Sequence, residues 1–316
     1  MSIYARSITK YPWIWAVIGA FFMWLLLGIF AGSLSLESLV TVATTASFLA
    51  IVAMGQMLVI TTGEGAIDLS IPSIITLSAF LSTGFINGNN FNLLYVIPIV
   101  LGIGAFIGLL NALSVLYLKI PPIIATLGMG YIVTTAILLY NKGFRAFTLA
   151  SILLHLSRDR LFGAFPVIVL LALGLVVLLQ LMFVYTKFGK SLMAVGQNAE
   201  AASLVGINVN LIRAIAYIMS GVFAAFGGIM IAARVGGAFL GLGDPYLMQT
   251  VASVVVGGTL ISGGKAVPIG TFFGSLFLIL LVTAMQVAGM KIGGQYIVTG
   301  LLIILVLFFA ANRARQ

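Results

Sequence analysis

The stretch Lys187–Arg213, KFGKSLMAVGQNAEAASLVGINVNLIR, interrupts two long apolar segments with residues that cannot sit in lipid. Within it, Asn198 is a residue type that caps a helix by accepting a hydrogen bond from a first-turn amide. Glu200 then falls in the first turn, where the helix dipole favours a negative charge. Gly206 suits the left-handed backbone that ends many helices. The pattern predicts a helix of about two turns over residues 199–205, carried on a basic loop.

One face of this predicted helix is made of small residues. Asn198, Ala201, Ala202 and Val205 follow the i, i+3, i+4, i+7 spacing of a packing stripe. Because these side chains are short, another protein can approach the helix closely. We therefore expect this face to bind a partner protein.

The composition of the chain identifies its solvent. Apolar residues make up 62% of the 316 residues and charged residues 7%, whereas a soluble domain carries about 25% charged residues. In lipid every backbone amide must be bonded internally, which leaves helices or a closed barrel. The apolar runs are about 17–25 residues long without alternation, which selects helices. The predicted fold class is an all-α polytopic membrane protein, with one transmembrane domain over residues 1–316.

Ten apolar segments predict about ten membrane spans. They cover residues 13–32, 39–61, 70–86, 94–117, 122–140, 166–185, 213–233, 246–262, 268–288 and 294–311. The first follows a short basic leader and has no small-residue cleavage site, so we interpret it as an uncleaved signal anchor.

The basic residues predict the orientation of the chain, because cytoplasmic loops are enriched in lysine and arginine. With both termini in the cytoplasm, nine of the 15 basic residues lie inside and six outside. The loop 141–165 is basic although it falls outside, so either the topology is wrong or that loop has its own reason to be basic. The net charge of +9 is therefore attributed to membrane topology and not to nucleic-acid binding.

The sequence offers little for catalysis. It has no cysteine, one histidine and six acidic residues, and no G-x-x-x-x-G-K-[ST] phosphate loop. We expect no enzymatic activity, no cofactor and no metal site. If the chain belongs to an active pump, a partner must supply the energy, because gradient-driven carriers usually keep charged residues inside the membrane.

Glycine and proline interrupt the third and eighth predicted spans. Such interruptions are typical of discontinuous helices that line a pathway, but small residues are also ordinary at helix contacts in membranes, and both interpretations stay open. Asp68 is either a gate or, as we favour, part of the cap that starts the third span. The candidate pathway residues are Asp68, Ser70, Asn111, Thr126, Gly257 and Gly258.

Several motifs carry a family resemblance. Residues 188–209 resemble the cytoplasmic loop of monosaccharide ABC-importer permeases of the ribose, xylose and galactose type, F-G-x-x-x-x-A-x-G-x-N-x-x-A-A-x-x-x-G-I. Residues 67–70 (IDLS), 108–111 (GLLN), 120–128 (IPPIIATLG) and 257–271 are similar to further family motifs in the same order. The surroundings of residues 67–70 depart from the family pattern, with Glu64 and Pro72 in place of commoner residues.

The resemblance implies a mechanism and its partners. It implies a BtuC-like importer permease architecture in a bacterial inner membrane, with a second permease copy or paralogue, ABC ATPase subunits, and a periplasmic sugar-binding protein. The loop 187–213 would couple the ATPase to the membrane through Gly196, Asn198, Glu200, Ala201, Ala202, Val205 and Gly206. The residues expected to dock the binding protein are Arg145, Arg158 and Arg160, with lipid headgroups or solvent as the alternative.

Two other functions compete with a sugar permease. The first is a permease of the same fold for a nucleoside, an amino acid or a sugar-like signal molecule. The second is a gradient-driven carrier, which the scarcity of charges inside the spans disfavours.

Overall fold

A computed structural model describes residues 13–143 and 148–313 of the chain. Helices make up nearly all of its regular structure, and the only strands in this part of the chain, β1 (Arg160–Leu161) and β2 (Phe165–Pro166), form one short hairpin. The predicted all-α class is confirmed.

Each predicted span coincides with most or all of one helix. These helices are α2 (Ile14–Ala31), α3 (Leu36–Thr61), α4 (Ile71–Ile86), α5 (Leu93–Leu116), α6 (Pro122–Asn141), α8 (Val167–Tyr185), α11 (Val209–Val235), α12 (Tyr246–Val256), α13 (Pro268–Val287) and α14 (Ile292–Arg313). Shorter elements are η1 (Asn90–Asn92), α7 (Ser151–Arg158), α9 (Lys187–Gln197) and α10 (Ala199–Leu204). Among the described residues, seven helices are long and apolar enough to cross a membrane, namely α2, α3, α5 with η1, α6, α8, α11 and α13. The number of ten spans stays a prediction.

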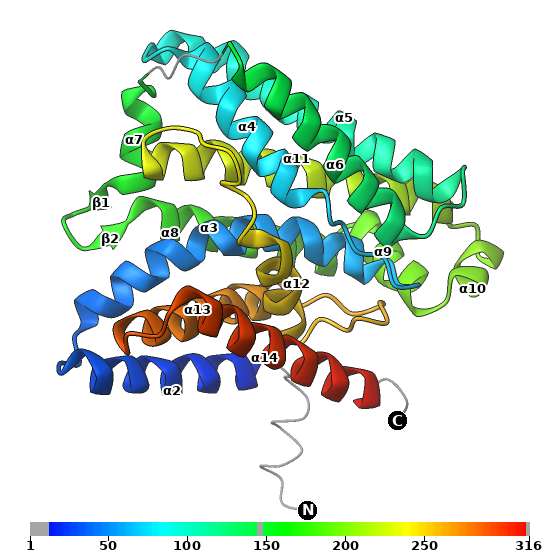
Figure 1. Cartoon of the computed structure of the whole chain (residues 1–316). Helices are drawn as coiled ribbons and strands as arrows, with labels where there is room; N and C mark the ends of the chain where they lie inside the picture. The colour runs from blue at the N-terminus through cyan, green and yellow to red at the C-terminus, as the bar shows by residue number, and fades with distance from the viewer. Residues whose placement is uncertain (1–12, 144–147, 314–316) are drawn as a thin grey trace, which may run out of the picture.

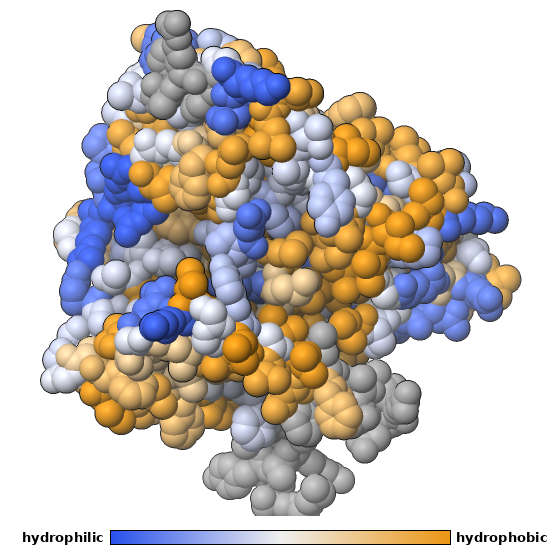
Figure 2. Space-filling view, in the orientation of Figure 1, coloured by the Kyte–Doolittle hydropathy of each residue, from blue (hydrophilic) through white to orange (hydrophobic). Residues whose placement is uncertain are grey.

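The long helices run across the molecule from the end that carries α10 to the end that carries the β1–β2 hairpin (Figure 1). Hydrophilic residues gather at both ends, and hydrophobic residues cover much of the surface between them (Figure 2). Gly196 lies close to both Gly63 and Gly264, and the three glycines come from three loops predicted to be cytoplasmic. At the other end Arg160 pairs with Glu37, from two loops predicted to be external. The loops therefore separate into the two predicted groups, and which group faces the cytoplasm stays a prediction.

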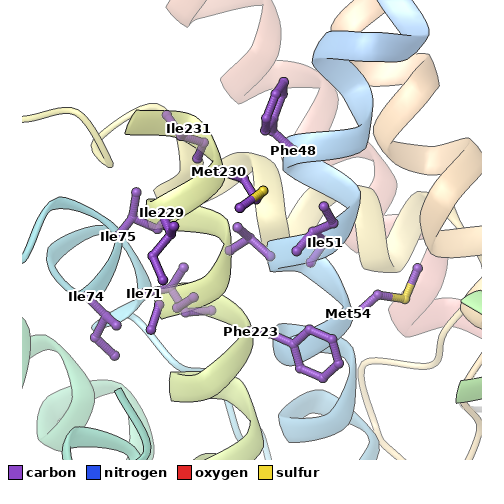
Figure 3. Close-up of a cluster of buried hydrophobic side chains, with 14 of the residues drawn as sticks. Phe48, Ile51, Met54, Ile71, Ile74, Ile75, Phe223, Ile229, Met230 and Ile231 are labelled. Atoms are coloured by element: carbon purple, nitrogen blue, oxygen red, sulfur yellow. The ribbon is translucent and has the colours of Figure 1, made fainter. Parts of the chain in front are cut away.

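Helix α3 forms the centre of the core. It is apolar on all sides, and such a helix is stable only when it is buried. In the most apolar 18-residue stretch of α3, 89% of the residues are buried inside the molecule. Side chains of α3, α4 and α11 meet there, as shown in Figure 3 for Phe48, Met54, Ile75 and Met230. By contrast, only 22% of the residues in the most apolar 18-residue stretch of α6 are buried. Much of the apolar surface of α6 is therefore left to contact lipid.

Helices α5 and α11 approach each other at glycine. A side chain at Gly104 would place its Cβ 2.4 Å from the carbonyl oxygen of Gly221, and one at Gly108 would place it 2.2 Å from that of Tyr217. Close backbone approach at small residues is the usual way in which membrane helices associate, because lipid supplies no hydrophobic drive between them.

Two of the helices, α4 and α12, are too short to cross the hydrocarbon core of a membrane as continuous straight helices. Helix α12 has 11 residues, or roughly 16 Å at 1.5 Å per residue, against a hydrocarbon core of about 30 Å. The predicted span 246–262 is wrong at its end, because the helix stops at Val256 and residues 257–267 form a loop in which Gly258 and Gly263 take left-handed conformations. Helix α4 has 16 residues and starts only after the buried segment that contains Asp68. The predicted interruption of the third and eighth spans is therefore confirmed.

Replacing Gly104 by valine tests the α5–α11 contact. We expect Gly104→Val to lower the free energy of unfolding by about 1–3 kcal/mol, because the new side chain meets backbone atoms that cannot rotate away. Gly102→Val, on the same helix in open space, should change it by less than about 0.5 kcal/mol. Thermal unfolding in detergent measures both, and equal losses would contradict the assigned packing.

Candidate transport pathway and coupling surface

The carboxylate of Asp68 is the hub of a buried polar network. Its Oδ1 accepts hydrogen bonds from the Ser70 amide (3.0 Å), the Ser70 hydroxyl (2.6 Å) and the Asn111 amide group (3.4 Å). Its Oδ2 accepts from the hydroxyl of Ser220 on α11, at 2.7 Å. Asp68 is 2% exposed, so these donors stabilise a charge that water does not reach.

Two further side chains bond the backbone around Asp68. The amide of Asp68 donates to Oε1 of Gln56 at 3.3 Å, and the amide of Leu69 donates to the hydroxyl oxygen of Thr126 at 3.0 Å. The Thr126 hydroxyl also lies 3.2 Å from the carbonyl oxygen of Ile67 and 2.9 Å from that of Pro122. Non-helical backbone at membrane depth is tolerated only where such partners replace water. Helices α3, α5, α6 and α11 thus all hold the short segment before α4.

The structure brings four of the predicted pathway residues together, and their buried side chains hold the backbone before α4 in place. Asp68, Ser70, Asn111 and Thr126 are all buried, and their side chains bond to one another or to nearby backbone. Ser70 is the N-cap residue of α4, and its backbone amide donates a hydrogen bond to the carboxylate of Asp68. This geometry agrees with the favoured interpretation of Asp68 as part of the cap.

Gly257 and Gly258, the other predicted pathway residues, follow the last turn of α12. A Cβ at Gly257 would lie 2.3 Å from the backbone of Gly270 on α13, which is the close packing that the sequence left open as the alternative to a pathway. Gly258 takes a left-handed conformation, with φ of 91°, and so turns the chain away from the helix axis.

A groove with mainly apolar walls and several polar side chains opens on the face formed by α4, α6, α12 and α14. It consists of two adjoining cavities of about 480 and 180 Å³ that share Asp244 and Leu247. The larger lies between α12, α13 and α14, and the smaller between α4, α6 and the loop before α12. Figure 2 shows hydrophilic residues in the middle of this face between hydrophobic flanks. The polar side chains that line the groove are Ser73, Tyr131, Thr134, Asp244, Gln249, Gln286, Gln295, Tyr296 and Thr299.

Asp244 lies in the groove because the loop after α11 folds back into the molecule. The amide of Gly243 donates to the Thr76 hydroxyl at 3.0 Å, and a Cβ at Gly243 would lie 2.0 Å from the carbonyl oxygen of Pro72 in the first turn of α4. The N-termini of α4 and α12 therefore meet beside Asp244, as in the discontinuous helices of transport sites. Within the described residues, no hydrogen bond or ion pair of the Asp244 carboxylate is found.

Sequence reasoning missed the residues of this groove. None of them was singled out from the sequence: Gln249, Gln286 and Gln295 fall inside the predicted spans 246–262, 268–288 and 294–311, and Asp244 just precedes the first of these. Polar side chains inside or beside three apolar segments were the available signal. Their convergence depends on tertiary contacts between α12, α13 and α14.

The predicted helix in the coupling loop is present as α10. The Asn198 side chain accepts a hydrogen bond from the Ala201 amide at 2.9 Å, and Gly206 has a φ of 84°, so the predicted cap and stop are confirmed. The helix ends at Leu204, one residue before the predicted end. The preceding residues, expected to form a loop, are the helix α9, in which the Thr186 hydroxyl oxygen accepts from the Gly189 amide.

The predicted small-residue face is wrong in one respect. Ala202 is 4% exposed and packs into the core, whereas Leu204 and Val205 are 87% and 76% exposed. The reason is that Ala202 faces the rest of the chain across the turn after α10, where its carbonyl accepts the amide of Ile207. The outward surface of the coupling segment is made of Ala201, Leu204 and Val205, and Ala202 does not belong to it.

Gly196 joins the coupling segment to the membrane helices. A Cβ at this position would lie 1.9 Å from the carbonyl oxygen of Thr61 and 2.3 Å from the amide nitrogen of Gly264. The Gly264 amide also donates to Thr61 at 3.0 Å, and the Gln197 side chain donates to the Gly264 carbonyl at 3.3 Å. The end of α9, the end of α3 and the loop after α12 therefore form one junction.

Two of the three predicted docking arginines, Arg158 and Arg160, already have partners within the chain. Both terminal nitrogens of Arg160 bond the carboxylate of Glu37, and this hydrogen bond, followed by the charge of Glu37, raises the pKa of Arg160. Arg158 donates from Nε to the carbonyl of Ala233 at 3.0 Å. Arg145 lies outside the described residues.

Within the described residues no group of three histidine, cysteine or acidic side chains is placed to hold a metal.

Seven of the described helices are long and apolar enough to cross a membrane. Together with a core built on the buried helix α3, they define a polytopic membrane protein. The family described as "Branched-chain amino acid transport system / permease component" matches residues 38–307, and the chain belongs to it.

Three relatives show the range of the likeness. The chain is 34% identical to the galactose/methyl galactoside import permease protein MglC of Escherichia coli (strain K12), over 86% of this chain and 85% of that one. It is 31% identical to the autoinducer 2 import system permease protein LsrC of Escherichia coli O9:H4 (strain HS), over 87% and 80%. It is 33% identical to the fructose import permease protein FrcC of Rhizobium meliloti, over 81% and 72%. No solved structure matches the chain.

Comparing two acidic residues tests the supporting role of the buried network. Asp68→Ala should lower the free energy of unfolding by about 3–5 kcal/mol, because it leaves buried donors from α4, α5 and α11 without an acceptor. Asp244→Ala, at an exposed carboxylate, should change it by less than about 0.5 kcal/mol. Thermal unfolding in detergent measures both, and a mild effect at Asp68 would show that the network does not hold α4.

Proposed function

We propose that this chain is the permease subunit of an ATP-driven importer and forms the membrane pathway for a monosaccharide in a bacterial inner membrane. The observation that carries the proposal is the groove centred on Asp244, which brings one carboxylate and three glutamine side chains together between apolar walls. The import permeases for galactose and for fructose among its relatives support the choice of a sugar.

The chemistry of the groove suits a polyhydroxylated ligand. A sugar presents hydroxyl groups that both donate and accept. The carboxylate of Asp244 can accept from them, and the amides of Gln249, Gln286 and Gln295 can both donate and accept. The aromatic side chains of Tyr131 and Tyr296 add apolar surface beside them. Pockets that orient a ligand commonly combine apolar walls with a few such polar groups.

A second permease copy, or a paralogue, would cover the groove. A carboxylate facing hydrocarbon is unfavourable, and Asp244 is exposed in the single chain. A partner facing α4, α6, α12 and α14 removes this cost and encloses a water-filled pathway between the two chains.

The energy would come from separate ATPase subunits that bind the outward surface of α10. Leu204 and Val205 give this surface an apolar contact, and Gly196 connects it to α3 and to the loop after α12. Closure of the ATPase would thereby move the end of α12, whose other end lines the groove. The soluble sugar-binding protein would dock at the opposite end, where Arg158 and Arg160 lie with Arg145 in the same loop.

A second candidate substrate is a sugar-like signal molecule, which the likeness to the autoinducer 2 permease favours. Uptake measured with galactose, fructose and autoinducer 2 in cells that carry only this system separates the candidates. Uptake that continues after the partner ATPase is inactivated would contradict the ATP-driven mechanism for any of them.

Asp244→Asn tests the groove. We expect sugar uptake to fall roughly tenfold or more, because charge-assisted hydrogen bonds contribute about 1.5–3 kcal/mol, while the unfolding temperature stays unchanged. Asp159→Asn, an exposed acid at the outer end, serves as the control. Normal uptake in Asp244→Asn would remove the groove from the pathway.

The double variant Leu204→Asp with Val205→Asp tests the coupling surface. It should abolish both ATP-dependent uptake and co-purification of the ATPase, since buried carboxylates without partners oppose the contact. Leu36→Asp places the same charge on an exposed leucine at the opposite end and should leave the ATPase bound. Co-purification at the level of the unmodified chain in the double variant would assign the ATPase to another surface.

A further inference from the structure

A separate cavity of about 320 Å³ lies at the α10 end of the molecule, away from the groove. Its walls are the segment after α3 (residues 62–66), the turn between α5 and α6 (residues 115–122) and the first turns of α11 (residues 210–217). Because α3 and α5 end here and α6 and α11 begin here, the cavity lies at the depth where the hydrocarbon core meets the lipid headgroups.

The cavity carries an excess of positive charge. Arg213 and Lys119 line it, with Glu64 as the only acid among the lining residues. The Arg213 side chain is 16% exposed, and its Nη2 lies 2.6 Å from Oε1 of Glu64. Lys119 forms no ion pair with any described residue. One cationic side chain is thus paired and the other is free to bind a ligand.

Tyr217 supplies the second, independent observation. It lines the same cavity and is fully buried, and its hydroxyl has no hydrogen-bond partner within the described residues. Asn210, Arg213 and Tyr217 are spaced along one face of α11. The charges that act on Tyr217 are those of Asp68 and Arg213. A buried hydroxyl without a partner is unfavourable, so a ligand held by Arg213 can complete its bond.

We propose that this cavity binds a phosphate-bearing anion through Arg213, Lys119 and the hydroxyl of Tyr217. Arginine and lysine are the usual ligands of phosphate oxygens, arginine through its planar fork and lysine as a point charge. Glu64 does not block the site, because its side chain is 64% exposed and solvent can take the place of Arg213. The depth of the cavity fits the headgroup of an anionic lipid in the same leaflet, and free phosphate shares the chemistry.

The test uses the full chain in lipid nanodiscs that contain phosphatidylcholine and phosphatidylglycerol. After extraction and washing in mild detergent, native mass spectrometry measures the phosphatidylglycerol that each variant retains. Lys119→Gln with Tyr217→Phe should retain roughly tenfold less than the unmodified chain, because it removes one charged and one neutral hydrogen bond. Lys291→Gln, a matched change of an exposed lysine at the opposite end, should retain as much as the unmodified chain.

A second arm measures the unfolding temperature in detergent with and without inorganic phosphate. Lipid retention that depends on Lys119 and Tyr217 assigns the site to a lipid headgroup, and a phosphate-induced rise in unfolding temperature that depends on them assigns it to free phosphate. Equal behaviour of the unmodified chain and the double variant in both arms would overturn the proposal, as would an equal loss in Lys291→Gln. If the double variant does not elute as a folded protein, the single variant Lys119→Gln, at an exposed side chain, decides between the same outcomes.

Discussion

The buried carboxylate of Asp68 is the constraint on which the rest of the structure depends. A charge in a low-dielectric interior is tolerated only when donors surround it, and here the donors come from α5, α11 and the start of α4. This network lets the chain leave the helical conformation before α4 while its backbone groups stay bonded. Helix α4 can therefore start inside the membrane, and the loop that carries Asp244 packs on its first turns.

The interrupted helices connect the two ends of the molecule. Helix α12 begins beside Asp244 in the groove, and the loop that follows it meets the end of α9 at Gly196. Because no side chain fits at Gly196, the coupling segment and the membrane helices are in direct backbone contact. The end of α9, the end of α3 and the loop after α12 thus meet in one junction.

The sequence was most informative where structure is local. The cap at Asn198 and the stop at Gly206 involve neighbours within a few residues, and the apolar runs report directly on helices in lipid. Asp68 bonds Ser220 across 152 positions of the chain, so no local pattern shows that it is the hub of a hydrogen-bond network. The orientation of Ala202 and the convergence of Asp244 with the glutamines of α12, α13 and α14 likewise depend on how helices pack, which periodicity does not determine. Helix α9 was missed because its short, basic sequence resembles a loop when its packing against α8 is unknown.

The central claim is that the outward surface of α10 receives the ATP-hydrolysing partner. Since the chain has no cysteine, a single Val205→Cys change carries a photo-activated crosslinker to this surface and to no other. Crosslinking in native membranes, followed by mass spectrometry of the adducts, should identify an ATPase subunit at Val205 and none at Leu36→Cys, which marks the opposite end. Capture of the ATPase from Leu36→Cys but not from Val205→Cys would contradict the account.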